Sequence, residues 1–108
     1  MRLEALVSYF RKGGSFSNFC ESNSLNPDSE VIEVYMEKPF SLTKDLAFFE
    51  IEETEGSVEY SHREVLYSNL FDFYFFLDAM EEAKNGEAKL LSDKELAKKL
   101  LDYAIHDA

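Results

Sequence analysis

A chain of 108 residues, 45% apolar and 15% aromatic, can form one hydrophobic core but not two, and its aromatic content excludes a disordered acidic tail. Its 22 acidic residues against 11 basic ones give a formal charge of −11, which would repel the phosphates of DNA, RNA and anionic membranes. We therefore expect a single domain, residues 1–108, whose partner, if it has one, is cationic.

The single cysteine and the N-terminal stretch indicate a cytoplasmic protein. Cys20 can form no disulfide within the chain, and Phe16 and Phe19 beside it indicate a buried, unreactive thiol. Glu4 interrupts the apolar N-terminal stretch, and no segment approaches the roughly 20 apolar residues of a membrane helix. We expect a cytoplasmic location without membrane contact.

Two helices are expected at the N-terminal end. Residues 2–12 show the i, i+3, i+4, i+7 spacing of an amphipathic helix, which a glycine pair then ends. Its predicted inner face is Leu3, Leu6, Val7 and Phe10. Ser15 is suited to cap a second, shorter helix, and the polar stretch 21–29 predicts a loop.

Three strands are expected in the middle of the chain. Residues 30–37 alternate as a strand that ends before Pro39. Its predicted inward residues are Ile32, Val34 and Met36, and its outward residues are Glu33, Tyr35 and Glu37. Residues 45–53 form the second strand. Its predicted inward residues are Ala47, Phe49 and Ile51. A turn at 54–57 would join it, as a hairpin, to a third strand that runs from Val58 to about Tyr67.

Two helices complete the predicted fold. The first begins at Ser68 or Asn69 and ends near residue 85, and its apolar run 70–77 cannot fit on one helix face. That run is either buried between a sheet and other helices or partly presented to a partner. Ser92 and Glu95 form a capping box for the last helix. The predicted inner face of the last helix is Ala97, Leu100, Leu101, Ala104 and Ile105.

The order of these elements predicts an α+β fold. It consists of an N-terminal helical pair, a three-stranded antiparallel sheet and two C-terminal helices packed on one face of the sheet.

No catalytic, metal or cofactor site is predicted. The glycine pair after the first helix lacks the sequence of a phosphate-binding loop. His62, His106 and Cys20 are too widely separated for a metal-binding motif. The run 61–64 contains Ser, His and Glu, but adjacent side chains of a strand point to opposite faces and cannot form a catalytic triad. We expect the chain to be no enzyme and to bind no cofactor and no metal.

The negative charge is concentrated in the middle of the chain. Residues 28–82 hold 15 acids and three bases, a formal charge of −12, and residues 45–61 hold six acids and no base. Aromatic side chains set among carboxylates are typical of interface anchors. The predicted partner-binding residues are Asp45, Glu50, Glu52, Glu53, Glu55, Glu59, Tyr35, Phe48 and Tyr60. Of these, Glu50, Glu52 and Glu59 are expected to share one face of the hairpin.

In its size, its −12 region, its acidic strand pair 46–60 and its lack of a catalytic motif, the chain resembles the small acidic immunity proteins of bacterial toxin systems, including those of contact-dependent growth inhibition. The resemblance implies a bacterial cytosol, a cognate toxin as the basic partner and no enzymatic activity. A nuclease is a natural toxin for such a partner, because its cleft carries the Lys and Arg that bind nucleic acid.

Two other functions fit the same sequence. A homodimeric structural or regulatory module would use the aromatic region from Phe71 to Phe76 as its interface. A nucleic-acid mimic that inhibits a DNA-binding protein would use the same electrostatics as the immunity protein.

Overall fold

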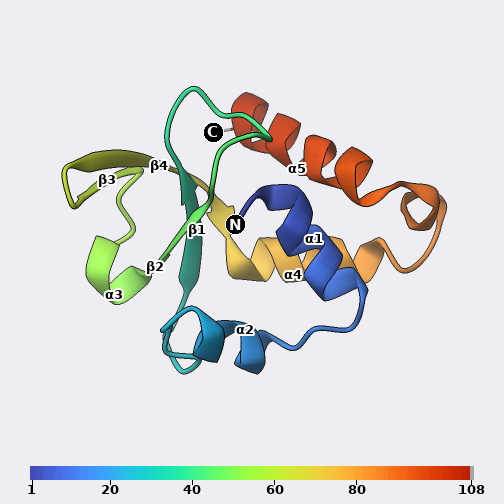
Figure 1. Ribbon diagram of the computed structural model, residues 1–108, viewed down its shortest axis with the longest axis horizontal. Coiled ribbons are helices and arrows are strands. Elements are labelled where there is room, and N and C mark those ends of the chain that lie inside the picture. Colours follow the sequence, from blue (N-terminus) through green and yellow to red (C-terminus); the bar gives the residue numbers. More distant parts are fainter. Residues whose placement is uncertain (108) are drawn as a thin grey trace.

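The computed structural model describes the backbone of residues 1–107 and the side chains of residues 1–106, and it shows a mixed α+β fold (Figure 1). The helices are α1 (Leu3–Arg11), α2 (Phe16–Ser22), α3 (Ile51–Thr54), α4 (Phe73–Glu82) and α5 (Asp93–Asp107), with the 3-10 helix η1 (Glu87–Leu90) before the last. The strands are β1 (Ile32–Met36), β2 (Ala47–Glu50), β3 (Glu59–His62) and β4 (Val65–Asp72). Within the described range, no helix combines the length and the apolar character needed to cross a membrane.

The sheet contains four antiparallel strands in the order β2-β1-β4-β3, one more than predicted. The predicted third strand 58–67 is instead a hairpin of β3 and β4, whose two-residue turn is Arg63 and Glu64. Both turn residues have positive φ, 50° and 69°, which Gly and Asn favour, so the sequence carries no turn signal there.

The prediction that residues 45–53 form a hairpin with the strand after them is also wrong. β2 and β3 lie at opposite edges of the sheet, and each pairs with a different inner strand. Residues 51–54, expected to be the end of a strand and the start of a turn, form the short helix α3. The carboxylates of this segment therefore do not lie along one strand pair.

β4 continues without a loop into α4, so the long helix begins later than predicted. Residues 68–72 pair with β1, where Glu33 lies opposite Asp72. Asp72 then caps α4, because its Oδ1 accepts a hydrogen bond from the Phe75 amide at 2.8 Å. The apolar run is thus divided between a strand and a helix, which explains why its side chains fit no single helix face.

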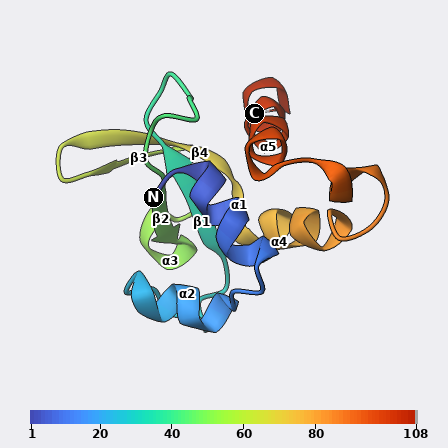
Figure 2. The same cartoon turned by 45° about the vertical axis from the view of Figure 1, so that its right-hand side comes forward.

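The main core lies between one face of the sheet and the helices α1, α4 and α5 (Figure 2). The predicted inner residues of the first helix and the first strand are confirmed as buried: Leu3, Leu6, Val7, Phe10, Ile32, Val34 and Met36. The capping box is also confirmed, since the Ser92 amide donates to Glu95 Oε1 at 2.9 Å and the Glu95 amide donates to Ser92 Oγ at 3.1 Å.

The inner face of α5 differs from the prediction at two positions, since Leu96, outside the predicted set, is buried and Ile105 is not. Ile105 is 47% exposed, whereas Ala104 beside it is buried. Ile105 lies in the last turn of α5, where it borders a surface hollow together with residues 38–40 instead of facing the core.

The sheet curls, and its second face also encloses side chains. β1 is buried on both faces: Tyr35 is fully buried and Glu33 is 9% exposed, although both were predicted to face solvent. The Phe49 ring centroid lies 4.9 Å from that of Tyr60 and 5.6 Å from that of Tyr67, which brings the two edges of the sheet together. We call Tyr35, Phe49, Tyr60, His62 and Tyr67 the aromatic cluster.

Phe48 and Phe49 of β2 contact different sides of the sheet, since successive strand residues point to opposite faces. Phe48 lies in the main core, with its ring centroid 5.0 Å from that of Phe19 and 6.1 Å from that of Phe73. Phe49 is buried as predicted, but in the aromatic cluster rather than against the helices.

Candidate functional site

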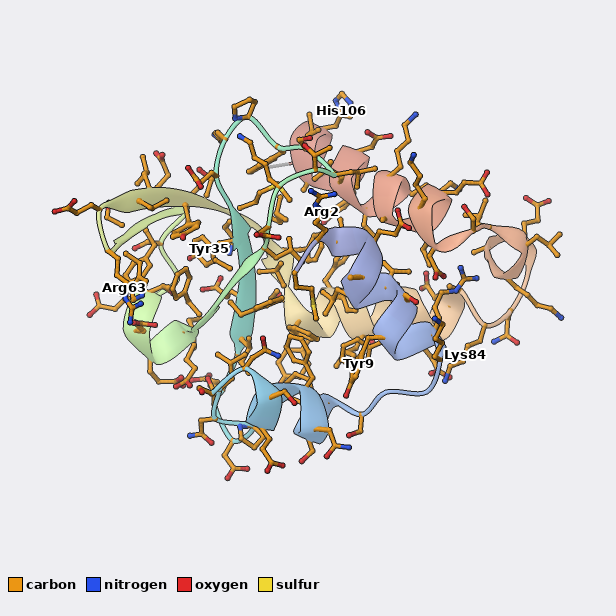
Figure 3. All side chains as sticks on the ribbon, in the orientation of Figure 1. Arg2, Tyr9, Tyr35, Arg63, Lys84 and His106 are labelled. Atoms are coloured by element: carbon orange, nitrogen blue, oxygen red, sulfur yellow. The ribbon has the colours of Figure 1, made fainter. Side chains whose placement is uncertain are left out.

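The hairpin of β3 and β4 and the short helix α3 extend away from the other helices (Figures 1 and 2). This part of the chain is rich in Glu. We call residues 50–64, which comprise α3, β3 and the hairpin turn, the acidic lobe. It holds six Glu and one basic residue, Arg63, which Figure 3 shows at the opposite end of the molecule from Lys84. The ion pairs among residues 1–106 join Met1 to Asp45, Arg11 to Asp93 and Lys84 to Glu81. Within these residues, no cation therefore neutralises the lobe through an ion pair.

Two of the predicted partner-binding carboxylates hold a neighbouring loop. Glu50 Oε2 accepts a hydrogen bond from the Asn26 amide at 2.9 Å. Glu52 accepts one from the Ser29 hydroxyl and one from the Glu30 amide, the latter at 3.1 Å. These hydrogen bonds lower the pKa of the Glu52 carboxyl below its usual value, and the bond from the Ser29 hydroxyl has the largest effect. Glu50 and Glu52 therefore have a structural role as well as a charge.

Four further carboxylates of the lobe are exposed, namely those of Glu53, Glu55, Glu59 and Glu64. Partial burial raises the pKa of the Tyr60 phenol, and the neighbouring Glu53 carboxylate raises it further. Glu59 precedes Tyr60 on β3 and so points to the opposite face of the strand. The expectation that Glu50, Glu52 and Glu59 share one face is wrong, because they come from opposite edges of the sheet and from α3.

Three other predicted partner-binding residues lie outside any exposed acidic surface. Tyr35, labelled beside β1 in Figure 3, is fully buried, and its hydroxyl donates to the Ser57 carbonyl oxygen. Phe48 packs in the main core. Asp45 is exposed, but it precedes β2 at the end remote from Glu50, where its backbone forms an isolated antiparallel β-bridge with Arg2. The aromatic member of the set that stays near free carboxylates is Tyr60, in contact with Glu53.

Cys20, a potential nucleophile, and His62 of β3 are both packed against apolar groups. Burial, with a smaller contribution from the Glu50 charge, raises the pKa of the Cys20 thiol, which disfavours the reactive thiolate. The His62 ring lies 5.2 Å from Phe49 and is stacked on Tyr60 at 6.3 Å. No group of three His, Cys, Asp or Glu side chains in the described part of the chain is arranged to hold a metal ion.

A groove lies next to the acidic lobe, and it was not predicted from the sequence. It encloses about 420 Å³ and continues into a second hollow of about 520 Å³, and both are bordered by Val58 and Asn69. We call it the Glu33 groove, because the Glu33 carboxylate lines its wall. Asp72 provides a second carboxylate, and Phe75 and Tyr103 provide aromatic surface. A glutamate in the middle of an otherwise apolar strand is the sequence signal that could have indicated this groove.

Comparisons of the chain with protein-family models, with curated proteins and with solved structures found no match. The function is therefore argued from the surface itself. The aromatic region from Phe71 to Phe76 offers little surface for a partner, since Phe71, Phe73 and Phe76 are buried and Tyr74 is the residue of this run that is largely exposed, at 61%.

Proposed function

We propose that this chain is a non-enzymatic binding protein that neutralises a basic, nuclease-type toxin through its acidic lobe, as an immunity protein. The observation that carries the proposal is the unneutralised charge of the lobe. Six carboxylates lie within 15 consecutive residues, and none forms an ion pair with the described residues of the chain. Like charges held close together destabilise a fold, and a cationic partner would relieve that repulsion.

The placement of the free carboxylates supports binding to a basic cleft. Glu53, Glu55 and Glu59 come from α3, its C-terminal cap and β3, so they are spread over a projecting surface rather than along one strand. A nuclease cleft presents Lys and Arg to a phosphate backbone, and separated carboxylates can occupy such phosphate positions. The net charge of −11 would also speed the encounter with a cationic protein by long-range attraction.

The test uses the protein encoded by the neighbouring reading frame, expressed alone and together with this chain. We expect it to arrest growth alone, and we expect this chain to restore growth and to co-elute with it. Replacing Glu53, Glu55 and Glu59 by Lys should slow association by about tenfold or more and abolish protection. All three residues are exposed, so the fold should persist, as circular dichroism would show.

The matched control replaces Glu21, Glu82 and Glu87 by Lys. These residues are also exposed and lie outside the lobe, and the change in net charge is the same. If both triple variants lose affinity equally, net charge and not the lobe determines binding. If the protein encoded by the neighbouring reading frame does not bind this chain at all, the immunity function is refuted. Binding of this chain to a DNA-binding protein instead would favour the nucleic-acid mimic.

A further inference from the structure

The Glu33 groove contains a buried carboxylate that only neutral groups contact. Glu33 Oε1 accepts a hydrogen bond from Thr54 Oγ1 at 2.9 Å, and Oε2 accepts one from Asn69 Nδ2 at 3.0 Å. The Tyr35 hydroxyl lies 3.5 Å from Oε1, but its proton is directed to the Ser57 carbonyl oxygen in a shorter hydrogen bond. The side chain is 9% exposed, and it forms no ion pair within residues 1–106. Burial of a carboxylate without a cation is costly, and two neutral donors offset only part of that cost. A cation in the groove would offset the rest.

A second carboxylate and an apolar rim complete the groove. Asp72 lies opposite Glu33 in the register of β1 and β4. The Phe75 and Tyr103 rings stack at 4.4 Å beside it, and Tyr103 is 43% exposed. Val58, 70% exposed, adds apolar surface at the rim. Apolar walls suit the methylene stem of a long basic side chain, and aromatic rings and carboxylates suit its charged end.

We propose that the Glu33 groove takes a lysine or arginine side chain of the basic partner. This rests on the proposed function and adds to it the place where one side chain of the partner is held. Charge complementarity decides the occupant, because an apolar group would bury Glu33 further without pairing it, and an acidic group would be repelled. The groove adjoins the lobe through Gly56 and Val58, which precede β3, so one partner surface can reach both.

The probe is Nα-acetyl-arginine amide, titrated into the ¹⁵N-labelled protein at about 150 mM salt and followed by NMR. We expect saturable shifts of the Gly56, Val58, Asn69 and Tyr103 amides, with a Kd on the order of 1 mM for a ligand of this size. The lysine analogue should shift the same amides. The citrulline analogue has nearly the same shape but no charge, and it should cause no saturable shift.

Two variants test whether the groove is the site. Glu33→Gln should weaken binding by about tenfold or more, with Glu82→Gln as the remote control. Val58→Lys keeps the test decisive even if Glu33→Gln fails to fold, since this exposed side chain can change without disturbing the core. Its ammonium group should compete for the groove and abolish the shifts, whereas Leu90→Lys, at an exposed apolar site elsewhere, should leave them unchanged.

Equal shifts with the citrulline analogue, or full binding by Val58→Lys, would overturn the inference. If the basic protein binds the lobe while the arginine probe causes no groove shifts, the groove inference fails and the proposed function stands. If the probe binds the groove but the protein from the neighbouring reading frame does not bind, the proposed function fails and the cation preference of the groove remains.

Discussion

The turn at Arg63 and Glu64 allows a quantitative prediction, because both residues hold a backbone conformation that L side chains disfavour. Their φ angles of 50° and 69° lie in the left-handed region, which costs about 1–2 kcal/mol per non-glycine residue. A two-residue hairpin with two positive φ angles is the turn that Asn-Gly forms most readily. We therefore expect Arg63→Asn combined with Glu64→Gly to stabilise the fold without changing its net charge.

The expected gain follows from these penalties. Glycine at position 64 removes most of one penalty but adds about 0.5–1 kcal/mol of backbone entropy cost, and Asn at position 63 removes part of the other. The double variant should gain about 1–2 kcal/mol, which raises Tm by roughly 4–8 °C for a chain of this length. Thermal and urea unfolding followed by circular dichroism would measure it, with a higher urea midpoint at constant m.

The matched control is Glu59→Gly, the same kind of exchange in the strand β3. Glu59 has no positive φ, so glycine there adds entropy cost without relieving strain and should lower Tm. A double variant with unchanged or lower Tm would show that the turn does not hold Arg63 and Glu64 in the left-handed conformation. The hairpin of β3 and β4 would then need a different register.

Two further predictions concern ionisable side chains. The folded pKa of Glu52 is lowered by hydrogen bonds from Ser29 and the Glu30 amide, so its contribution to stability is present above the unfolded pKa and lost as the pH falls through the folded value. Glu52→Gln should thus have a lower urea midpoint than the wild-type protein at about pH 7, and the difference should shrink as the pH falls below the unfolded pKa of a glutamate, about 4.3. A pH-independent difference would contradict this. Burial raises the pKa of Cys20, so iodoacetamide should modify the folded protein at least about 100-fold more slowly than the urea-unfolded chain, and equal rates would refute the buried position.

The first and last helices could be predicted because their signals are local, whereas α3 and the start of α4 could not. The 3.6-residue spacing of the first helix and the capping box at Ser92 act within a few residues, and both are present in the fold. Ile105 shows the limit of such patterns, since how far the buried face of a helix extends depends on the elements packed against it and not on its own sequence.

The sheet could be predicted only as a set of extended segments. The turn at Arg63 and Glu64 has no glycine or asparagine, and residues 68–72 become a strand because β1 pairs with them across the fold. Tyr35 looked exposed because an alternating strand normally has one wet face. It is buried because the sheet curls and brings Phe49 and Tyr60 together, which is a property of the whole sheet.

The sequence predicts the negative charge of the candidate site, but not which side chains form its surface. Acidic composition alone locates the region around residues 50–64. Which carboxylates are free depends on distant partners: Glu50 binds the Asn26 amide and Glu52 binds the Glu30 amide, more than 20 residues away in each case. The groove at Glu33 needs β1, β4 and α5 in place together, so it exists only in the folded chain.

The position of β1 makes the acidic lobe and the helical body thermodynamically interdependent. Val34 is buried in the main core and Tyr35 in the aromatic cluster, so one strand supplies a wall to each. When either side loses its packing, the other loses a strand rather than a single contact. A destabilising change on a helix, remote from every lobe carboxylate, therefore also weakens the framework that positions those charges. Any binding that depends on the lobe would thus be coupled to the cooperativity of the whole fold.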